Sequence, residues 1–303
     1  MASVMELREI EAFLVLSEEL NFGRAAERLF ITRPRMSQLI RDLERQVGGA
    51  LVVRTSRRVV LTPAGADLAA GLGAAYQELR GALDRARAAA RHAAGQLRVG
   101  FYSAIIADLL GGPLRAFGQR CPGIEVSLTG VPWCDMLGPL RRGDVDVMAL
   151  WTPLAEPDLT IGPAFSVQDR IILTAAGHPL AARPEATLDD LADYGAFEMC
   201  PPFPDPLREA VLPLATPGGR AIGRQPVGSL SQAITLVPHT LRVHPTVAAA
   251  MRVFNRPGLA GVPVPQLPPL SAALAWRSAA SNPHTLALAD TIREITGSGD
   301  TVP

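Results

Sequence analysis

Apolar residues recur at helical spacing in two short segments near the start of the chain, on either side of a tight turn. The first segment covers about residues 23–30, and its small alanines allow a second helix to approach closely. Thr32 is suited to cap that second helix and Pro34 to its first turn, where a missing N–H costs little. The apolar stripe of the second helix consists of Met36, Leu39, Ile40, Leu43 and Val47. The pattern predicts a helix-turn-helix.

An alternating segment, residues 51–61, follows and predicts a two-stranded hairpin. Its basic tip, with Arg54, Arg57 and Arg58, suits contacts with phosphates or the minor groove. From Arg33 to Arg58 the chain has seven arginines and two acids, although its formal net charge is zero. A solvated charged surface is the alternative for each helix taken alone. Helix, turn, helix and basic wing together favour DNA binding.

The polar face of the second helix carries side chains that can read base edges in the major groove. Gln can bridge adenine, Arg can bridge guanine, and Ser can bond bases or phosphate. The residues expected at double-stranded DNA are Thr32, Arg33, Pro34, Arg35, Ser37, Gln38, Arg41, Arg54, Arg57 and Arg58. These residue types predict sequence-specific readout without indicating which bases are read.

Residues 63–92 are rich in good helix formers and predict one long linker helix. A heptad seam can be drawn through Leu68, Leu72, Ala75, Leu79, Ala82 and Ala86. A surface helix of a single domain is the alternative. A helix of this length with little else to pack against favours a partner chain, and hence a homodimer with two DNA-binding heads.

Residues 93–303 alternate between strand and helix patterns, which predicts an open α/β fold. Two crossings between sheets are expected, giving one lobe of about residues 97–168 and 263–297 and a second of about residues 169–262. The whole chain is therefore expected to be a multidomain protein: a winged helix-turn-helix over residues 1–62, the linker helix, and a two-lobed α/β domain.

Candidate ligand-binding residues lie where predicted strands end, because ligands bind beyond the carboxyl ends of strands in such sheets. Ser103 follows the first strand of this domain, so its hydroxyl and the following N–H groups could hold a carboxylate. Plain N-capping is an equally suitable role. Trp133, Trp151 and Phe203 fall on predicted loops and suggest an apolar or aromatic ligand, with core filling as the alternative.

Met5 to Leu61, followed by the residues Leu-Thr-Pro-Ala-Gly at 61–65, resembles the DNA-binding domain of the LysR-type transcriptional regulators. The family commonly has Ser-Gln-Pro where this chain has Thr-Arg-Pro at 32–34, and a basic residue in place of Gln38. The resemblance implies a periplasmic-binding-protein-like effector domain, a small-molecule effector, and a homodimer or homotetramer.

The resemblance also points to further effector candidates. Ser229 and Ser231 match the strand-to-helix turn where family members hold effector groups, with capping as the alternative. A glycine-containing turn of the family is replaced by residues 237–244, so the wall of the cleft is expected to differ here. His244 could bond a ligand carboxylate, although a lone histidine among apolar residues is more often structural.

Composition and sequence patterns limit where the protein is expected in the cell and which metal or disulfide chemistry it can have. The 303 residues are 48% hydrophobic and 19% charged, and every basic side chain other than histidine is Arg. The start of the chain lacks the pattern of a signal peptide and no apolar run is long enough for a membrane helix, so a cytoplasmic protein is expected. Cys121, Cys134 and Cys200 are scattered, which predicts buried, inert thiols and no metal site or disulfide.

Three classes of function compete. A regulator uses the wing, the linker helix and the cleft at once, whereas a non-specific architectural DNA binder or a solute-binding protein uses only half of the chain. An enzyme lacks support, since no catalytic or nucleotide-binding motif is found. No cofactor is expected. Because peroxide-sensing members of the family use a cysteine pair and no second Cys follows Cys200, a redox role is only a secondary hypothesis.

Overall fold

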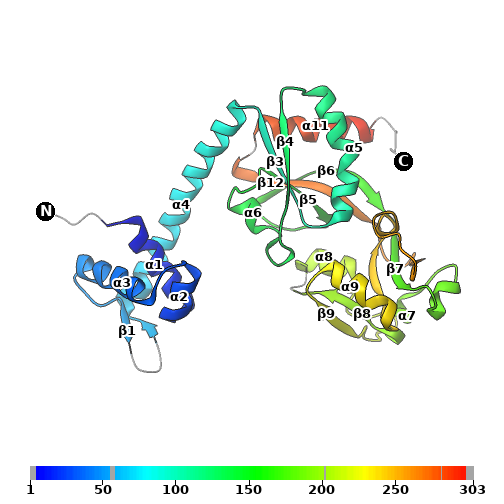
Figure 1. Ribbon diagram of the computed structural model, residues 1–303, viewed down its shortest axis with the longest axis horizontal. Helices are drawn as coiled ribbons and strands as arrows, with labels where there is room; N and C mark the ends of the chain where they lie inside the picture. Colours follow the sequence, from blue (N-terminus) through cyan, green and yellow to red (C-terminus); the bar gives the residue numbers. More distant parts are fainter. Residues whose placement is uncertain (1–4, 55–58, 201–202, 281, 298–303) are drawn as a thin grey trace. The chain divides into compact units, whose positions relative to one another are not determined.

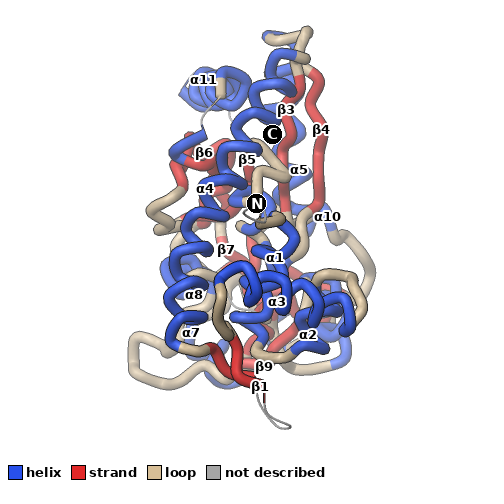
Figure 2. The backbone as a smooth tube through the Cα atoms, turned by 90° about the vertical axis from the view of Figure 1, so that its left-hand side faces the viewer, coloured by secondary structure: helices blue, strands red, loops and turns tan. Residues whose placement is uncertain are grey.

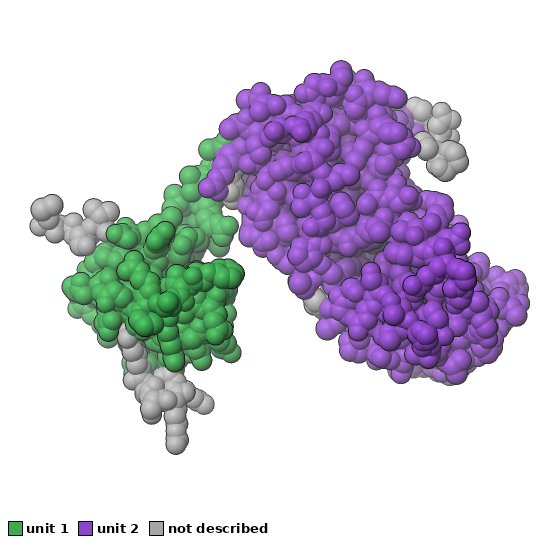
Figure 3. All heavy atoms as spheres, viewed as in Figure 1, with its two compact units in different colours: residues 1–86 green, residues 87–303 purple. Residues whose placement is uncertain are grey.

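A computed structural model of the chain describes residues 5–54, 59–200, 203–280 and 282–297. The chain divides into two units, residues 1–86 and residues 87–303 (Figure 3). The helix α4, Pro63–Ala93, begins in the first unit and ends in the second. It is a single helix of 31 residues, as the sequence predicts. No helix in the described part of the chain is long and apolar enough to cross a membrane.

The first unit contains the predicted helix-turn-helix and wing. Its elements are α1 (Leu7–Glu19), α2 (Phe22–Arg28), α3 (Arg33–Val47), β1 (Val52–Arg54) and β2 (Val59–Leu61), followed by the start of α4. Asn21 caps α2 by accepting hydrogen bonds from the backbone N–H groups of Gly23 and Arg24. Thr32 caps α3 as predicted, with Oγ1 3.4 Å from the Arg35 nitrogen. Gly48 ends α3 in the left-handed region at φ 79°.

One apolar core holds these helices together. Phe13 and Leu16 of α1 pack on the buried stripe of α3, which consists of Met36, Leu39, Ile40 and Leu43. Val47, also predicted in that stripe, is 44% exposed, because it is the last residue of α3 and lies beyond the core. Leu51 and Val52 extend the core to the wing, whose strands pair Val52 with Leu61.

The junction between the wing and α4 is closely packed. The Thr62 N–H donates to the carbonyl of Leu51 at 2.9 Å, and Thr62 Oγ1 accepts from the Gly65 N–H at 3.0 Å. A Cβ atom on Gly65 would lie 2.0 Å from the Leu51 carbonyl oxygen. The first turn of α4 can therefore approach this backbone only because residue 65 has no side chain.

The second unit is built on a mixed five-stranded sheet of order β4-β3-β5-β12-β6 (Figure 1). Strand β3 is parallel to β4 and β5, and β12 is antiparallel to β5 and β6. The strands are β3 (Gln96–Phe101), β4 (Glu125–Gly130), β5 (Val147–Thr152), β6 (Leu159–Gln168) and β12 (Leu270–Arg277). The helices α5 (Ala104–Arg120) and α11 (Pro283–Gly297) pack on each other and on this sheet, around Leu97, Val99, Phe117, Leu274 and Ile292.

A second group of strands forms the other lobe. An antiparallel sheet has the order β10-β7-β11, and the parallel pair β8-β9 is linked to it through a bridge between Ala196 and Val243. These strands are β7 (Arg170–Ala175), β8 (Ala196–Met199), β9 (Arg224–Val227), β10 (His244–Val247) and β11 (Leu259–Pro263). The chain enters this lobe after Gln168 and leaves it after Pro263, close to the crossings that the sequence predicts.

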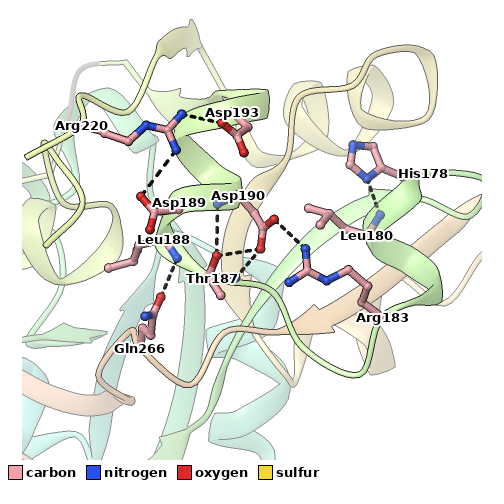
Figure 4. A network of polar contacts seen from close by, with 10 residues as sticks. All are labelled: His178, Leu180, Arg183, Thr187, Leu188, Asp189, Asp190, Asp193, Arg220 and Gln266. Atoms are coloured by element: carbon pink, nitrogen blue, oxygen red, sulfur yellow. Dashed lines mark hydrogen bonds and ion pairs between the residues drawn. The ribbon is translucent and has the colours of Figure 1, made fainter. Parts of the chain in front are cut away.

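Short helices connect the strands of the second unit (Figure 2). They are α6 (Gly138–Arg141), α7 (Leu188–Tyr194), α8 (Asp205–Val211), α9 (Leu230–Leu236) and α10 (Ala250–Val253). Figure 4 shows how α7 is fixed: Thr187 and Asp190 form a capping box, and Arg183 pairs with Asp190 at 2.6 Å. The Leu188 N–H donates to Gln266 Oε1 at 2.6 Å, which ties the segment between β11 and β12 to this lobe.

Candidate functional site

The N-terminal turn of α3 presents unpaired positive charge. Arg33 and Arg35 are exposed, and neither forms an ion pair with a described residue. Cations at a helix N-terminus are unfavourable, because the helix dipole is already positive there. Phosphate oxygens would remove this repulsion and accept hydrogen bonds from the guanidinium groups. The arrangement therefore suits an anion such as the DNA backbone.

The middle of the α3 face is more constrained. Gln38 is half-buried, and its Nε2 donates to Asp42 Oδ1 at 2.8 Å, while Arg41 Nη2 donates to Gln38 Oε1 at 3.0 Å. Arg45 pairs with Asp42 at 3.0 Å. Both polar atoms of the Gln38 amide are thus engaged in this network, and they would have to exchange partners to bridge an adenine.

The remaining predicted DNA contacts differ in exposure. Thr32, Pro34 and Arg41 are exposed and Ser37 is half-buried, all on α3 or at its cap. In the wing, Arg57, Arg58 and the side chain of Arg54 lie outside the described residues. The structure thus brings the seven α3 candidates onto one helix and leaves their contacts with DNA as a prediction.

A cavity of about 310 Å³ lies in the second unit, with walls from both lobes. It is lined by all seven residues that the sequence singles out as effector candidates: Ser103, Trp133, Trp151, Phe203, Ser229, Ser231 and His244. These residues come from segments up to 141 positions apart in the sequence, since the first is residue 103 and the last residue 244. Their placement in one cavity is observed, and their role in ligand binding remains a prediction.

Two of the serines cap helices as well as lining the cavity. Ser103 Oγ accepts from the N–H groups of Ile105 and Ile106, at 3.2 and 3.4 Å. Ser229 Oγ accepts from the Gln232 N–H at 3.1 Å. The capping role that competed with ligand binding is therefore real at both positions. Each hydroxyl still has a proton to donate, so capping does not prevent ligand contact.

An aromatic cluster forms one part of the wall. The Trp133 and Phe203 ring centroids lie 4.4 Å apart, and Tyr102 lies 5.3 Å from Trp133, in edge-to-face arrangements. Tyr102 Oη accepts from the Trp151 backbone N–H at 3.1 Å, and burial raises the pKa of the Tyr102 hydroxyl. Tyr102 was not predicted from the sequence, although it lies between the end of β3 and Ser103.

Charged residues in the cavity wall were also missed: Arg170, Glu198 and Arg208. Glu198 pairs with Arg208 at 2.9 Å and with Arg224. Arg170 is buried, and burial lowers its pKa to about 10. Arg170 directly precedes the apolar run Ile-Ile-Leu at 171–173, but an arginine at the start of a strand is ordinarily exposed, so the run alone does not predict its burial.

His244 is buried beside these groups. Its Nδ1 lies 3.4 Å from the carbonyl oxygen of Phe197. Burial, with a smaller contribution from the charge of Arg170, lowers the pKa of His244 to about 4. The imidazole is therefore neutral near pH 7 and adds no positive charge to the cavity.

The cysteines depart from the sequence-based expectation. Cys121 is half-buried, whereas Cys134 and Cys200 are exposed, so the prediction of buried thiols is wrong for these two. Cys134 lies in a single 3-10 turn, Trp133–Asp135, and Cys200 follows the last residue of β8. All three are free thiols.

Comparisons with known proteins agree on one family. Residues 7–66 match the bacterial regulatory helix-turn-helix protein of the lysR family, and residues 90–296 match the LysR substrate binding domain. The HTH-type transcriptional regulator AlsR of Bacillus subtilis (strain 168) is 32% identical over 189 residues, which are 62% of this chain and 62% of AlsR. The alignment thus spans less than two thirds of AlsR.

Another relative and a solved structure extend the match. The HTH-type transcriptional regulator ShiR of Corynebacterium glutamicum (strain R) is 32% identical over 203 residues, covering 66% of this chain and 67% of ShiR. Full-length CbnR complexed with its target DNA has a TM-score of 0.56 and 21% identity, with 96% of this chain and 99% of CbnR covered. At that identity the likeness concerns the fold.

Proposed function

We propose that this chain, which belongs to the LysR family of bacterial regulatory helix-turn-helix proteins, is a transcriptional regulator that binds promoter DNA and responds to a small molecule in its cavity. The observation that carries the proposal is the unpaired positive charge of Arg33 and Arg35 on the capped, exposed end of α3. A solute-binding protein would have no use for that charge. Relatives named as transcriptional regulators support the same function, and no catalytic role is assigned.

The proposal includes self-association through α4. Leu79 and Leu83 are 44% and 45% exposed on this helix, whereas Leu68 and Leu72 pack on the core of the first unit. A second copy of α4 would cover the exposed leucines. The result would be a homodimer, or a tetramer of two dimers, that presents two reading helices to symmetric half-sites. Binding to chromosomal DNA implies a cytoplasmic location.

Footprinting tests the proposal on the DNA that flanks the gene for this chain, with and without candidate metabolites. Protection of a defined site in excess random competitor DNA is expected, and a metabolite should change its extent or affinity. Arg41→Ala should weaken binding and relax preference at one base pair by about 1–3 kcal/mol. Arg115→Ala, an exposed arginine on α5 in the second unit, is the matched control. Binding that is uniform along the DNA and is lost when random DNA is added would contradict the proposal.

A further inference from the structure

Arg170 is a buried cation in the cavity wall that no carboxylate of the described residues neutralises. The residue is only 3% exposed to solvent. Nε donates to the Thr246 carbonyl at 2.9 Å, Nη1 to the Ala210 carbonyl at 2.6 Å and Nη2 to the Val211 carbonyl at 2.8 Å. Among the described residues, no acid lies within ion-pair distance of it. Buried charges are ordinarily paired, because desolvation costs several kcal/mol per ion.

The same chain neutralises other partly buried arginines. Arg98 and Arg91, with side chains 22% and 23% exposed, both reach Asp146, whose side chain is 4% exposed. Arg170 is more buried than either and, among the described residues, donates hydrogen bonds only to neutral carbonyl groups. The arginines also differ in location, because Arg170 lines the cavity, whereas Arg91, Arg98 and Asp146 do not. A ligand could therefore supply the negative charge that the chain omits here.

The other charges of the cavity reinforce this imbalance. Glu198 is the only acid among the residues described as lining the wall, and it is shared between Arg208 and Arg224. Arg170, Arg208 and Glu198 are the charged residues described as lining the wall, which leaves an excess of one positive charge there. An anion is attracted to such a site, and a cation is repelled.

A purely structural role for Arg170 is the competing explanation, because two of its acceptors are the last carbonyls of α8. That role uses three of the five N–H groups of the guanidinium. The other two have no acceptor among the described residues, so a carboxylate could accept them without breaking the contacts to α8.

The rest of the wall indicates the body of the ligand. Tyr102, Trp133 and Phe203 present aromatic rings, and Trp151, Leu230 and Phe254 add apolar surface. A volume of about 310 Å³ equals roughly ten water molecules at ~30 Å³ each, which is room for a single-ring molecule. Aromatic rings prefer offset or edge-to-face contact with another ring.

We propose that the cavity binds a single-ring aromatic monocarboxylate, with the carboxylate at Arg170 and the ring against Tyr102, Trp133 and Phe203. This inference rests on the proposed function, in which the cavity is the effector site. It names the chemical class of that effector. It excludes aromatic amines, which the positive charge would repel, and neutral aromatic amides, which would leave Arg170 without a counter-ion.

Calorimetry on the full-length wild-type protein tests the class with three matched probes: benzoate, its neutral isostere benzamide, and the cation benzylamine. Benzoate should bind with a Kd below about 1 mM and at least about tenfold more tightly than benzamide, because a hydrogen bond to a charged acceptor is stronger than a neutral one. Benzylamine should not bind. Equal binding of benzoate and benzamide, or no benzoate binding below that Kd, overturns the proposal without any variant.

Two variants test whether the carboxylate binds at Arg170. Arg170→Met should bind benzoate and benzamide with about the same Kd, and Arg170→Lys should restore part of the preference for benzoate. Thermal unfolding identifies any variant that has not folded, and inorganic phosphate shows whether any small anion suffices. A folded Arg170→Met that keeps the wild-type preference, or phosphate that displaces benzoate at equal concentration, contradicts the assignment. Footprinting on DNA is a separate measurement. If the calorimetry contradicts the proposed class of ligand, the proposal that the chain is a transcriptional regulator is unaffected.

Discussion

Burial sets the protonation state of single residues in the cavity wall. His244 is 5% exposed, and the adjacent Arg170 is 3% exposed, yet the two respond in opposite ways. An imidazole can give up its proton near neutral pH, so burial and a neighbouring cation leave it neutral. A guanidinium cannot, so Arg170 retains its charge in spite of a lowered pKa. Of these two residues, Arg170 therefore carries a fixed charge and His244 becomes charged only in acid.

The neutral state of His244 predicts a stability that depends on pH. Its pKa falls from 6.5 in the unfolded chain to about 4 in the folded protein, so the unfolded state binds more protons between these values. Stability should rise with pH across this window and fall on acidification, by up to roughly 3 kcal/mol from this residue. Urea unfolding from pH 4 to pH 7 should show a smaller change for His244→Asn than for wild type. His239→Asn, at an exposed position, controls for the substitution itself; equal slopes in wild type and His244→Asn would contradict the prediction.

Sequence reasoning found cavity residues wherever the signal was local. Ser103 was identified because a serine between a predicted strand and a predicted helix is recognisable from neighbouring residues, and Ser229 because it matches a turn of the family. Arg170 was missed because its acceptors lie about 40 positions away, at the end of α8. Cys134 and Cys200 were wrongly predicted to be buried, because the exposure of a thiol depends on which segments cover it. Side-chain surroundings of this kind follow from tertiary packing.

Elements were predicted best where their ends carry chemical signals. The start of α3 follows from Thr32 and Pro34, and the structure places both as expected. The single helical turn α6 begins at Gly138 and Pro139, because a proline fits the first turn of a helix, where its missing N–H costs little. The close contact at Gly65 could not be predicted, since it joins α4 to the backbone of the wing.

That contact predicts opposite effects for two glycines of the same helix. Gly65→Ala should destabilise the first unit, because its Cβ would lie 2.0 Å from the Leu51 oxygen and the backbone would have to move. Gly71→Ala meets nothing within 4 Å and should stabilise α4 by up to about 1 kcal/mol. Thermal unfolding of both variants measures the difference. Two variants with the same shift would show that the junction is not rigidly packed.

At the scale of the whole molecule, the salt dependence of DNA binding should show how many copies of the chain bind one DNA site together. Each phosphate neutralised contributes about 0.9 to the slope of log affinity against log salt concentration. If Arg35 contacts phosphate in a dimer on two half-sites, Arg35→Ala should reduce the slope by about two such contributions. Fluorescence anisotropy over a series of NaCl concentrations measures it, with Arg115→Ala as control. A reduction by one contribution would indicate a single bound copy, and no reduction would remove Arg35 from the interface.

The two crossings between the lobes differ in length. Only Asp169 separates β6 from β7, whereas residues 264–269 separate β11 from β12. Gln266 attaches that second segment to α7, and the Val264 N–H donates to the Arg170 carbonyl at 3.0 Å, so little slack remains there either. Rotation about this pair of short joints is the motion that the connections permit most readily. Arg170 is the first residue after the shorter joint, so a ligand bound to its guanidinium would lie beside the connection between the two lobes.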